Sequence, residues 1–397
     1  MKKYIYMVTI CTLIVLNGCK KPYNPQAISA PNNYLVIEGV INSGSDSTII
    51  KLSRTVNVLN SNTVSPELHA LLTVESDQDN VYPLIETTNG RYTSPGLNLD
   101  NSRKYRLRIK TQTNKEYLSD FVQVVNSPAI DTISYAIQSN GVSIYSNTHD
   151  PNNATRYYRW DYQETWEFHS DFFSQFKSNG DTVLYRDLVN DNIYQCWGNQ
   201  ASSTIILGSS AKLIKDVIVN NPITFVPSGS EKFTSRYSIL VRQYALTGEA
   251  YNFWQNLKKN TEELGSIFDA QPSQLKGNIH STTDSREPVI GYISVGSISS
   301  QRIYINVQQL PAWLPVKAYV GCKLDTFLFK YVAPGSTTVV NQENQFFNYN
   351  KGAYSPLIPV SSVARPAGPT IGHSGSTPEC VDCTIRGTNK KPTFWKE

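Results

Sequence analysis

Seven consecutive residues, Lys104–Lys110, alternate without interruption between two kinds of side chain. Tyr105, Leu107 and Ile109 take every second position, and lysine or arginine takes all the others. Successive side chains of a β-strand point to opposite faces, so this run predicts a strand with one face in an apolar core and the other in water. Strands that are apolar on one face are typical of antiparallel sheets, so we expect a mainly β chain.

Further strand signals surround this run, with turn residues between them. Strands are expected at 34–41, 48–52, 70–75, 91–93 and 117–125. Short strands at such regular spacing predict an N-terminal β-sandwich over residues 33–126, of the immunoglobulin-like or transthyretin-like kind. The polar stretch Asn126–Ala129 is the expected junction to the next domain.

Residues 130–397 are expected to form a larger β-rich domain with one docked α-helix near 249–264. Apolar side chains recur there at helical spacing, at Ala250, Phe253, Trp254, Leu257 and Leu264. Segments 289–295 and 302–307 predict a pair of hairpin strands. The tail from Pro356 to Pro378 is rich in proline, glycine and serine and therefore predicts a loop.

The N-terminus reads as an export signal. Lys2 and Lys3 precede an uncharged, mostly apolar run that is too short to cross ~30 Å of hydrocarbon as a helix. The run ends in Leu16-Asn17-Gly18-Cys19, which resembles the bacterial lipobox. We therefore expect residues 1–18 to be a removed signal peptide, Cys19 to carry lipid, and residues 19–32 to be a proline-containing tether. We expect the protein to be anchored in the outer membrane, in either the periplasmic or the surface-facing leaflet.

Four cysteines remain after the signal and the lipidated residue: Cys196, Cys322, Cys380 and Cys383. An even number in an exported chain predicts two disulfides, and three pairings are open. The spacing Cys380-x-x-Cys383 also fits half of a zinc site completed by Cys322 or His373, or a redox pair. Because the compartment is oxidising, we favour disulfides that pin the tail to the body.

An aromatic stretch follows the predicted domain junction. Tyr158, Trp160, Tyr162, Trp166 and Phe168 share one parity and hence one face of a strand. We interpret this face as sandwich core. The alternative is a platform on which Trp160 and Trp166 stack against a ligand such as a sugar.

The sequence carries no catalytic signature and assigns no residue to a metal or a cofactor. Basic residues number 36 and acidic residues 32, and the two signs are interspersed, so we expect no nucleic-acid partner. Paired carboxylates of a hydrolase stay open as an alternative, although nothing singles out a pair.

Several segments resemble a family of Bacteroidota lipoproteins labelled domain of unknown function 4249. The most specific are Gly277-Asn278-Ile279 and the closing Cys380-Val381-Asp382-Cys383. The resemblance supplies no catalytic residues. It implies an outer-membrane lipoprotein whose relatives are often encoded beside TonB-dependent receptors. Our leading hypothesis is therefore a non-enzymatic binding or accessory subunit of a TonB-dependent nutrient-uptake system. A carbohydrate-binding module and a hydrolase at the cell envelope are the alternatives.

Three Asp-Ser or Asp-Thr pairs resemble the short O-glycosylation motif of exported Bacteroidota proteins. The hydroxyl residues are Ser47, Thr132 and Thr182. Ordinary turn chemistry explains the same pairs without any modification.

Overall fold

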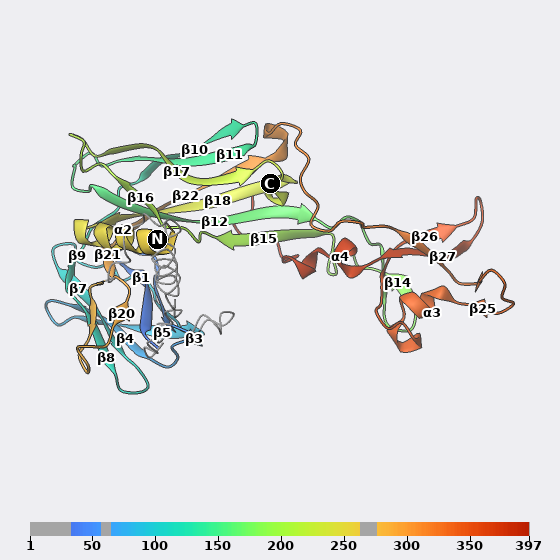
Figure 1. Ribbon diagram of the computed structural model, residues 1–397, viewed down its shortest axis with the longest axis horizontal. Coiled ribbons are helices and arrows are strands. Elements are labelled where there is room, and N and C mark those ends of the chain that lie inside the picture. Colours follow the sequence, from blue (N-terminus) through green and yellow to red (C-terminus); the bar gives the residue numbers. More distant parts are fainter. Residues whose placement is uncertain (1–32, 57–64, 263–275, 397) are drawn as a thin grey trace, which may run out of the picture.

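The computed structural model describes residues 33–56, 65–262 and 276–396, which form three units (Figure 1). An N-terminal sandwich and a middle sandwich lie against each other, and a distal arm projects from the middle sandwich. The predicted signal peptide, Cys19 and the tether lie outside the described residues. Within the described ranges, every helix is too short or too polar to span a bilayer.

The N-terminal sandwich is one long sheet that curls over itself around an apolar core. Its strands are β1 (Leu35–Asn42), β2 (Thr48–Arg54), β3 (Ser65–Pro66), β4 (Leu71–Ser76), β5 (Val81–Thr88), β6 (Arg91–Ser94), β7 (Lys104–Lys110), β8 (Glu116–Ser119), β9 (Val122–Gln123), β19 (Ile279–Ser281), β20 (Val289–Ile290) and β21 (Ser294–Gly296). Strand β7 has the bounds that the alternation predicted, and Tyr105, Leu107 and Ile109 are all buried. The antiparallel neighbour β4 places Leu72 beside Ile109, so the apolar faces of the two strands join one core.

The N-terminal sandwich is not completed by residues 33–126 alone. Strand β19 pairs with β8, and β20 and β21 pair in parallel with β1. The expected hairpin of 289–295 with 302–307 is therefore wrong, because its first half belongs to the N-terminal sandwich. Its second half lies in β22 (Ile298–Asn306), which pairs with β18 (Arg236–Leu246) of the middle sandwich.

The middle sandwich packs a three-stranded sheet on a five-stranded sheet. The smaller sheet contains β10 (Ile130–Gln138), β11 (Gly141–His149) and β17 (Val217–Pro227). The larger one contains β12 (Tyr157–His169), β15 (Gln195–Ala201), β16 (Ile206–Ser209), β18 and β22, with the short 3-10 helices η2 (Glu231–Phe233) and η3 (Val307–Gln309) at its edge. Apolar side chains from both sheets meet between them in a single core, which includes Val142, Ile144, Ile239 and Val241.

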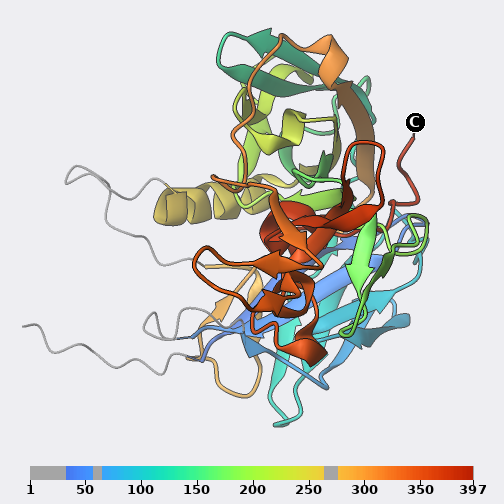
Figure 2. The same cartoon turned by 90° about the vertical axis from the view of Figure 1, so that its right-hand side faces the viewer.

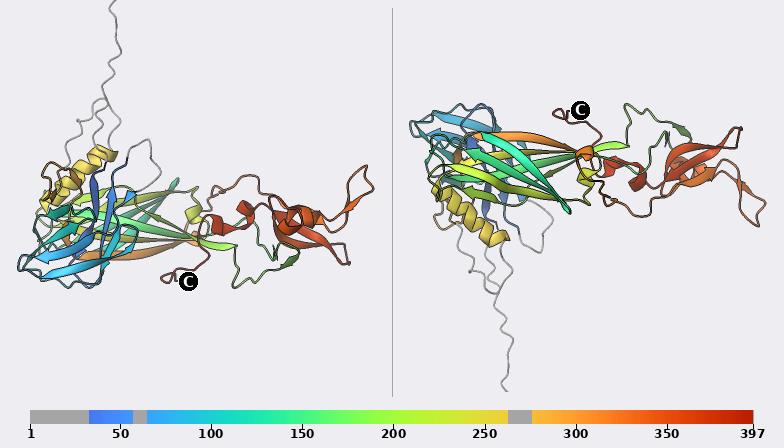
Figure 3. Two further views of the ribbon diagram at one scale, coloured as in Figure 1. Left: turned by 90° about the horizontal axis from the view of Figure 1, so that it is seen from below. Right: turned by 90° about the horizontal axis from the view of Figure 1, so that it is seen from above.

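Helix α2 (Gly248–Glu262) lies where the two sandwiches meet (Figure 3). Its buried Phe253 packs 5.5 Å from the ring of Tyr292 in the N-terminal sandwich, and Trp254 faces the middle sheet. The predicted helix is confirmed, and its last two expected residues lie outside the described ones. The helix therefore joins the two sandwiches through aromatic contacts on both sides.

The distal arm, residues 171–193 and 320–381, extends away from both sandwiches (Figures 1 and 3) and points toward the viewer in Figure 2. It contains β13 (Phe176–Ser178), β14 (Val183–Tyr185), β23 (Asp325–Leu328), β24 (Tyr331–Val332), β25 (Val339–Val340), β26 (Ile358–Ala364), β27 (Thr370–Ser376), α3 (Gln342–Phe346), η4 (Tyr349–Lys351) and α4 (Pro378–Val381), followed by η5 (Cys383–Ile385) at its base. The expected loop over 356–378 is wrong, since β26 and β27 form an antiparallel hairpin there.

Candidate functional site

The aromatic face of β12 is the core of the middle sandwich. Trp160 is 1% exposed, and its indole Nε1 donates to Gln243 Oε1 at 3.0 Å. Tyr158 stacks beside it, with ring centroids 5.7 Å apart. A ring enclosed in this way cannot receive a ligand, so the stacking alternative is wrong for Trp160 and the core interpretation holds.

Trp166 lies at the end of the same face and is half-buried. The Lys232 ammonium lies 5.2 Å from its ring centroid and pairs with Glu164 at 2.6 Å. The hydroxyl of Tyr237 also donates to Glu164, at 2.8 Å, and burial together with this carboxylate raises the pKa of Tyr237. Trp166 therefore covers a buried ion pair and does not form an open stacking platform.

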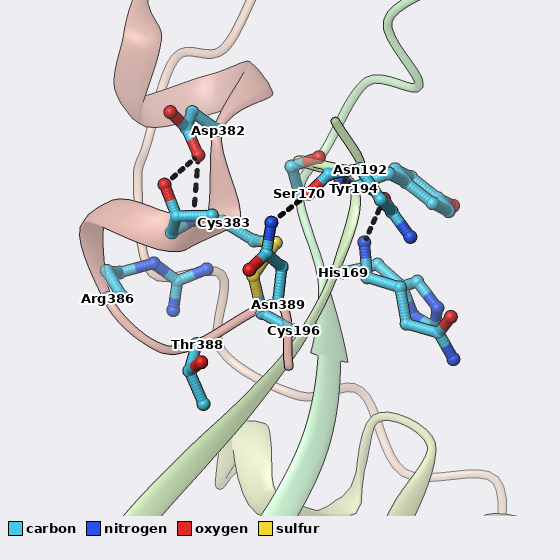
Figure 4. Close-up of a disulfide and its surroundings, with 12 residues drawn as sticks. His169, Ser170, Asn192, Tyr194, Cys196, Asp382, Cys383, Arg386, Thr388 and Asn389 are labelled. Atoms are coloured by element: carbon cyan, nitrogen blue, oxygen red, sulfur yellow. Dashed lines mark hydrogen bonds between the residues drawn. A yellow bond between two sulfur atoms is a disulfide. The ribbon is translucent and has the colours of Figure 1, made fainter. Parts of the chain in front are cut away.

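All four remaining cysteines form disulfides, as predicted. Cys196 of β15 bonds to Cys383, and Cys322 bonds to Cys380. Figure 4 shows the first bond joining the middle sheet to the C-terminal segment, where Asn389 Nδ2 also donates to the Asn192 carbonyl at 2.7 Å. The zinc and redox alternatives for Cys380-x-x-Cys383 are wrong for this state, because each cysteine is bonded to a partner outside that motif.

The two disulfides fasten the arm at its base. Cys322 and Cys380 close the arm on itself, and the Cys196–Cys383 bond ties the residues that follow the arm to the body. A small apolar cluster, which includes Ile193, Val360 and Val381, surrounds the Cys322–Cys380 bond. The Cys322–Cys380 bond therefore restricts the arm internally, and the Cys196–Cys383 bond restricts its motion relative to the body.

A buried acid–base pair lies inside the arm. His373 of β27 and Glu343 of α3 are 8% and 5% exposed, and Nδ1 of the histidine lies 2.5 Å from Oε1 of the glutamate. The ring centroid of Phe176 lies 4.4 Å from that of the His373 imidazole. His373 is thus committed to the arm core and does not complete a metal site with the cysteines.

Exposed apolar side chains gather on the arm. Twelve of the 28 large apolar side chains exposed among the described residues belong to it, so its surface is unusually apolar for its size. They are Phe173, Leu184, Tyr185, Leu188, Val189, Val320, Leu324, Val332, Val339, Phe346, Tyr349 and Tyr354. No local sequence pattern marks this surface, because exposed valine and tyrosine side chains cannot be told from buried ones before the fold is known.

A cleft of ≈ 400 Å³ lies between the N-terminal sandwich and the first turn of α2. Lys104 and Phe121 line one side, and Thr247 and Glu249 line the other. The lining side chains carry charges of both signs beside the exposed ring of Phe121. Its residues come from distant parts of the chain, and no local signal in the sequence marks them.

The three hydroxyl residues of the predicted O-glycosylation motifs are all exposed. Ser47 lies in the turn between β1 and β2, Thr182 lies in the turn between β13 and β14, and Thr132 lies on the edge strand β10. These positions leave room for a sugar, and the modification stays a prediction. No group of three or more His, Cys, Asp or Glu side chains suited to a metal ion occurs within residues 33–56, 65–262 and 276–396.

Comparison with known proteins gives the family. A family model described as a domain of unknown function (DUF4249) matches residues 20–302. The chain belongs to the DUF4249 family. No curated protein matches it. A two-domain fibronectin type-III segment of chicken tenascin is similar among solved structures, at 12% identity and a TM-score of 0.16, covering 53% of this chain and 90% of that chain.

The DUF4249 match contains the Gly277-Asn278-Ile279 block and ends before the distal cysteines. Asn278 is 7% exposed and holds the backbone of Ile293 from both sides, since Nδ2 donates to its carbonyl and Oδ1 accepts from its amide, each at 2.9 Å. A Cβ on Gly277 would lie 1.9 Å from the Gly291 carbonyl oxygen. This block of the DUF4249 sequence therefore clamps two segments together and shows a structural role.

Proposed function

We propose that this protein is an outer-membrane lipoprotein that works by binding and not by catalysis, as an accessory subunit of a TonB-dependent nutrient-uptake system. The observation that supports the proposal best is the distal arm, which stands away from the body, is fastened by two disulfides and carries exposed apolar side chains. An excess of exposed apolar side chains on one unit favours a site that meets another protein.

The construction of the arm suits binding. A surface that is already ordered loses little conformational entropy when a partner docks, so covalent fastening favours affinity. Tyr185 and Val189, which are 80% and 86% exposed, lie on the β13–β14 side of the arm, Tyr185 at the end of β14 and Val189 in the segment after it. Tyrosine is also among the residues that contribute most at protein interfaces.

Co-purification from membranes tests the proposal. We expect the tagged full-length protein, extracted in mild detergent, to bring down a TonB-dependent receptor that mass spectrometry identifies. Replacing both Tyr185 and Val189 by serine should reduce the recovered receptor at least ~10-fold, because apolar contact area is lost at the interface.

The matched control is the same double change at Leu213 and Ile214, which are also exposed but lie on the middle sandwich. This control should leave recovery of the receptor unchanged. If wild-type protein brings down no receptor, the accessory role is wrong. Equal losses in both variants would show that the arm is not the docking element.

A further inference from the structure

The outer face of the larger middle sheet carries three arginines in a diagonal row. Arg159 of β12 lies opposite Tyr244, Arg242 of β18 lies opposite both Asp161 and Ser300, and Arg302 of β22 lies opposite Leu240. Each step moves one strand across and two residues along, which separates diagonal neighbours by about 7–8 Å. We call Arg159, Arg242 and Arg302 the arginine row.

Arg159 is stacked against two aromatic rings and makes no hydrogen bond among the residues that the structure describes. Its guanidinium carbon lies 4.3 Å from the ring centroid of Tyr244 and 4.5 Å from that of Trp254, so it is stacked between the sheet and α2. Within the described part of the chain, its Nε is buried without an acceptor, and the closest carboxylate oxygen, on Asp161, is 4.0 Å from Nη1. An arginine has five N–H donors, so most of this group's binding capacity is unused.

Asp161 does not neutralise the row. Its Oδ1 accepts from Arg242 Nε at 2.5 Å, and its Oδ2 accepts from the Tyr244 hydroxyl at 2.8 Å. Arg302 donates to the Ser238 hydroxyl at 3.0 Å and stacks 3.7 Å from the ring of Phe394, with no carboxylate within 4.0 Å among the residues that the structure describes. Burial without such a partner lowers the pKa of Arg302.

Three half-buried guanidiniums therefore have one carboxylate beside them, and it forms a close ion pair with Arg242 alone. Partly desolvated cations are unfavourable unless anions compensate them, and the described residues supply only Asp161. Planar guanidinium groups match carboxylate and sulfate oxygens two at a time, and stacking on aromatic rings orients them before a ligand arrives. The row thus provides positive charge that a ligand with several anionic oxygen groups would neutralise.

The floor between the arginines is mostly polar, with half-buried Leu240 as its apolar member. Ser300 is exposed beside Arg242, and Gln163 Nε2 donates to Asn199 Oδ1 at 3.2 Å on the same face. Trp254 bounds one end of the row and Phe394 bounds the other. We propose that the arginine row binds an acidic polysaccharide, whose successive carboxylate or sulfate groups pair with Arg159, Arg242 and Arg302.

The chemistry of this face favours a sugar polymer over other polyanions. Amide and hydroxyl side chains between the cations can pair with the hydroxyl groups of neutral parts of a saccharide, and the aromatic end groups present flat apolar surface. Asp161 within the row would repel a densely charged phosphate backbone. The site lies on the body, so it does not depend on the partner proposed for the arm.

Binding measurements with four polymers test the proposal. Purified full-length protein is titrated with polygalacturonate, dextran sulfate, neutral dextran and duplex DNA at several salt concentrations. We expect binding to at least one acidic polysaccharide that weakens as salt rises, and none to neutral dextran. Arg159→Gln, Arg242→Gln and Arg302→Gln should each weaken that binding about tenfold or more, since each removes a charge-assisted contact.

Two further variants separate loss of the site from unfolding and from the loss of any surface arginine. Ser300→Glu adds a negative charge to the exposed floor without disturbing a stacked arginine, so it should weaken binding to the same degree in a protein that melts normally. Arg286→Gln removes an arginine whose side chain is 92% exposed on a loop of the N-terminal sandwich, and it should change nothing. The proposal is wrong if neither acidic polysaccharide binds, if DNA binds more tightly, or if Ser300→Glu and Arg286→Gln behave alike.

Discussion

At the scale of single residues, buried polar groups show where the middle sandwich depends on pH. Asp150 is 8% exposed and accepts hydrogen bonds from the backbone amides of Asn152, Ala154 and Thr155. Burial alone would raise the pKa of this carboxyl, but those amides and the Thr155 hydroxyl outweigh it and lower the pKa below 3.8. The ionised form is therefore the one that the fold stabilises.

A pH series of unfolding measurements checks this account. Because the folded pKa of Asp150 is the lower one, its contribution is complete above the unfolded pKa of about 3.9 and is lost as pH falls through the folded value. Asp150→Asn should therefore flatten the decline in the free energy of unfolding below pH ~4. Urea titrations between neutral and acidic pH measure it, with Asp79→Asn, at an exposed turn, as the control. Parallel curves for wild type and Asp150→Asn would contradict the assignment.

At the scale of elements, local patterns predicted well and distant pairings did not. The alternation in β7 and the helical spacing in α2 are local sequence patterns, so both elements could be predicted from the sequence. The parallel pairing of β20 and β21 with β1 joins residues that are far apart in the chain, and no local pattern encodes it.

The hairpin of β26 and β27 and the arginine row could not be predicted from the sequence. Strand β27 contains Gly375 because a Cβ there would lie 2.4 Å from the Phe347 ring, yet glycine in a sequence suggests a loop. The arginine row was equally hidden, since Arg159, Arg242 and Arg302 become neighbours only through the registers of three strands. The pairing of the cysteines depends on tertiary structure in the same way.

The contact between Asn278, just before β19, and Ile293, just before β21, gives a prediction at this scale. Asn278→Ala removes two hydrogen bonds and leaves the amide and carbonyl of Ile293 buried without those partners. The expected loss in the free energy of unfolding is about 2–3 kcal/mol. Urea unfolding measures it against Asn252→Ala, on the exposed side of α2. A loss no larger than that of the control would show that the clamp contributes little.

At the scale of the whole molecule, one disulfide should decide whether the arm is a rigid body. Replacing Cys322 and Cys380 together by serine opens a 58-residue loop, which costs about 4 kcal/mol in the chain-entropy model. Arg186 reports on the result, because its side chain is 7% exposed and pairs with Asp191 while the arm is folded. Trypsin should cleave after Arg186 faster in the variant, as followed by mass spectrometry, while the two sandwiches resist. Unchanged cleavage would mean that noncovalent packing alone holds the arm.

The N-terminal anchor would determine how arm and arginine row can meet their ligands, since a lipid at residue 19 would hold both near a membrane. Burying each CH₂ group of an acyl chain contributes about 0.8 kcal/mol, so a protein without the proposed lipid should leave the membrane. Cys19→Ser should therefore move the chain from the membrane pellet to the soluble fraction of lysed cells, as seen by immunoblotting. Cys11→Ser changes a cysteine inside the predicted signal peptide and should leave the protein in the pellet. If Cys19→Ser stays membrane-bound, the anchor lies elsewhere, and the proposed placement beside an outer-membrane receptor loses its main physical support.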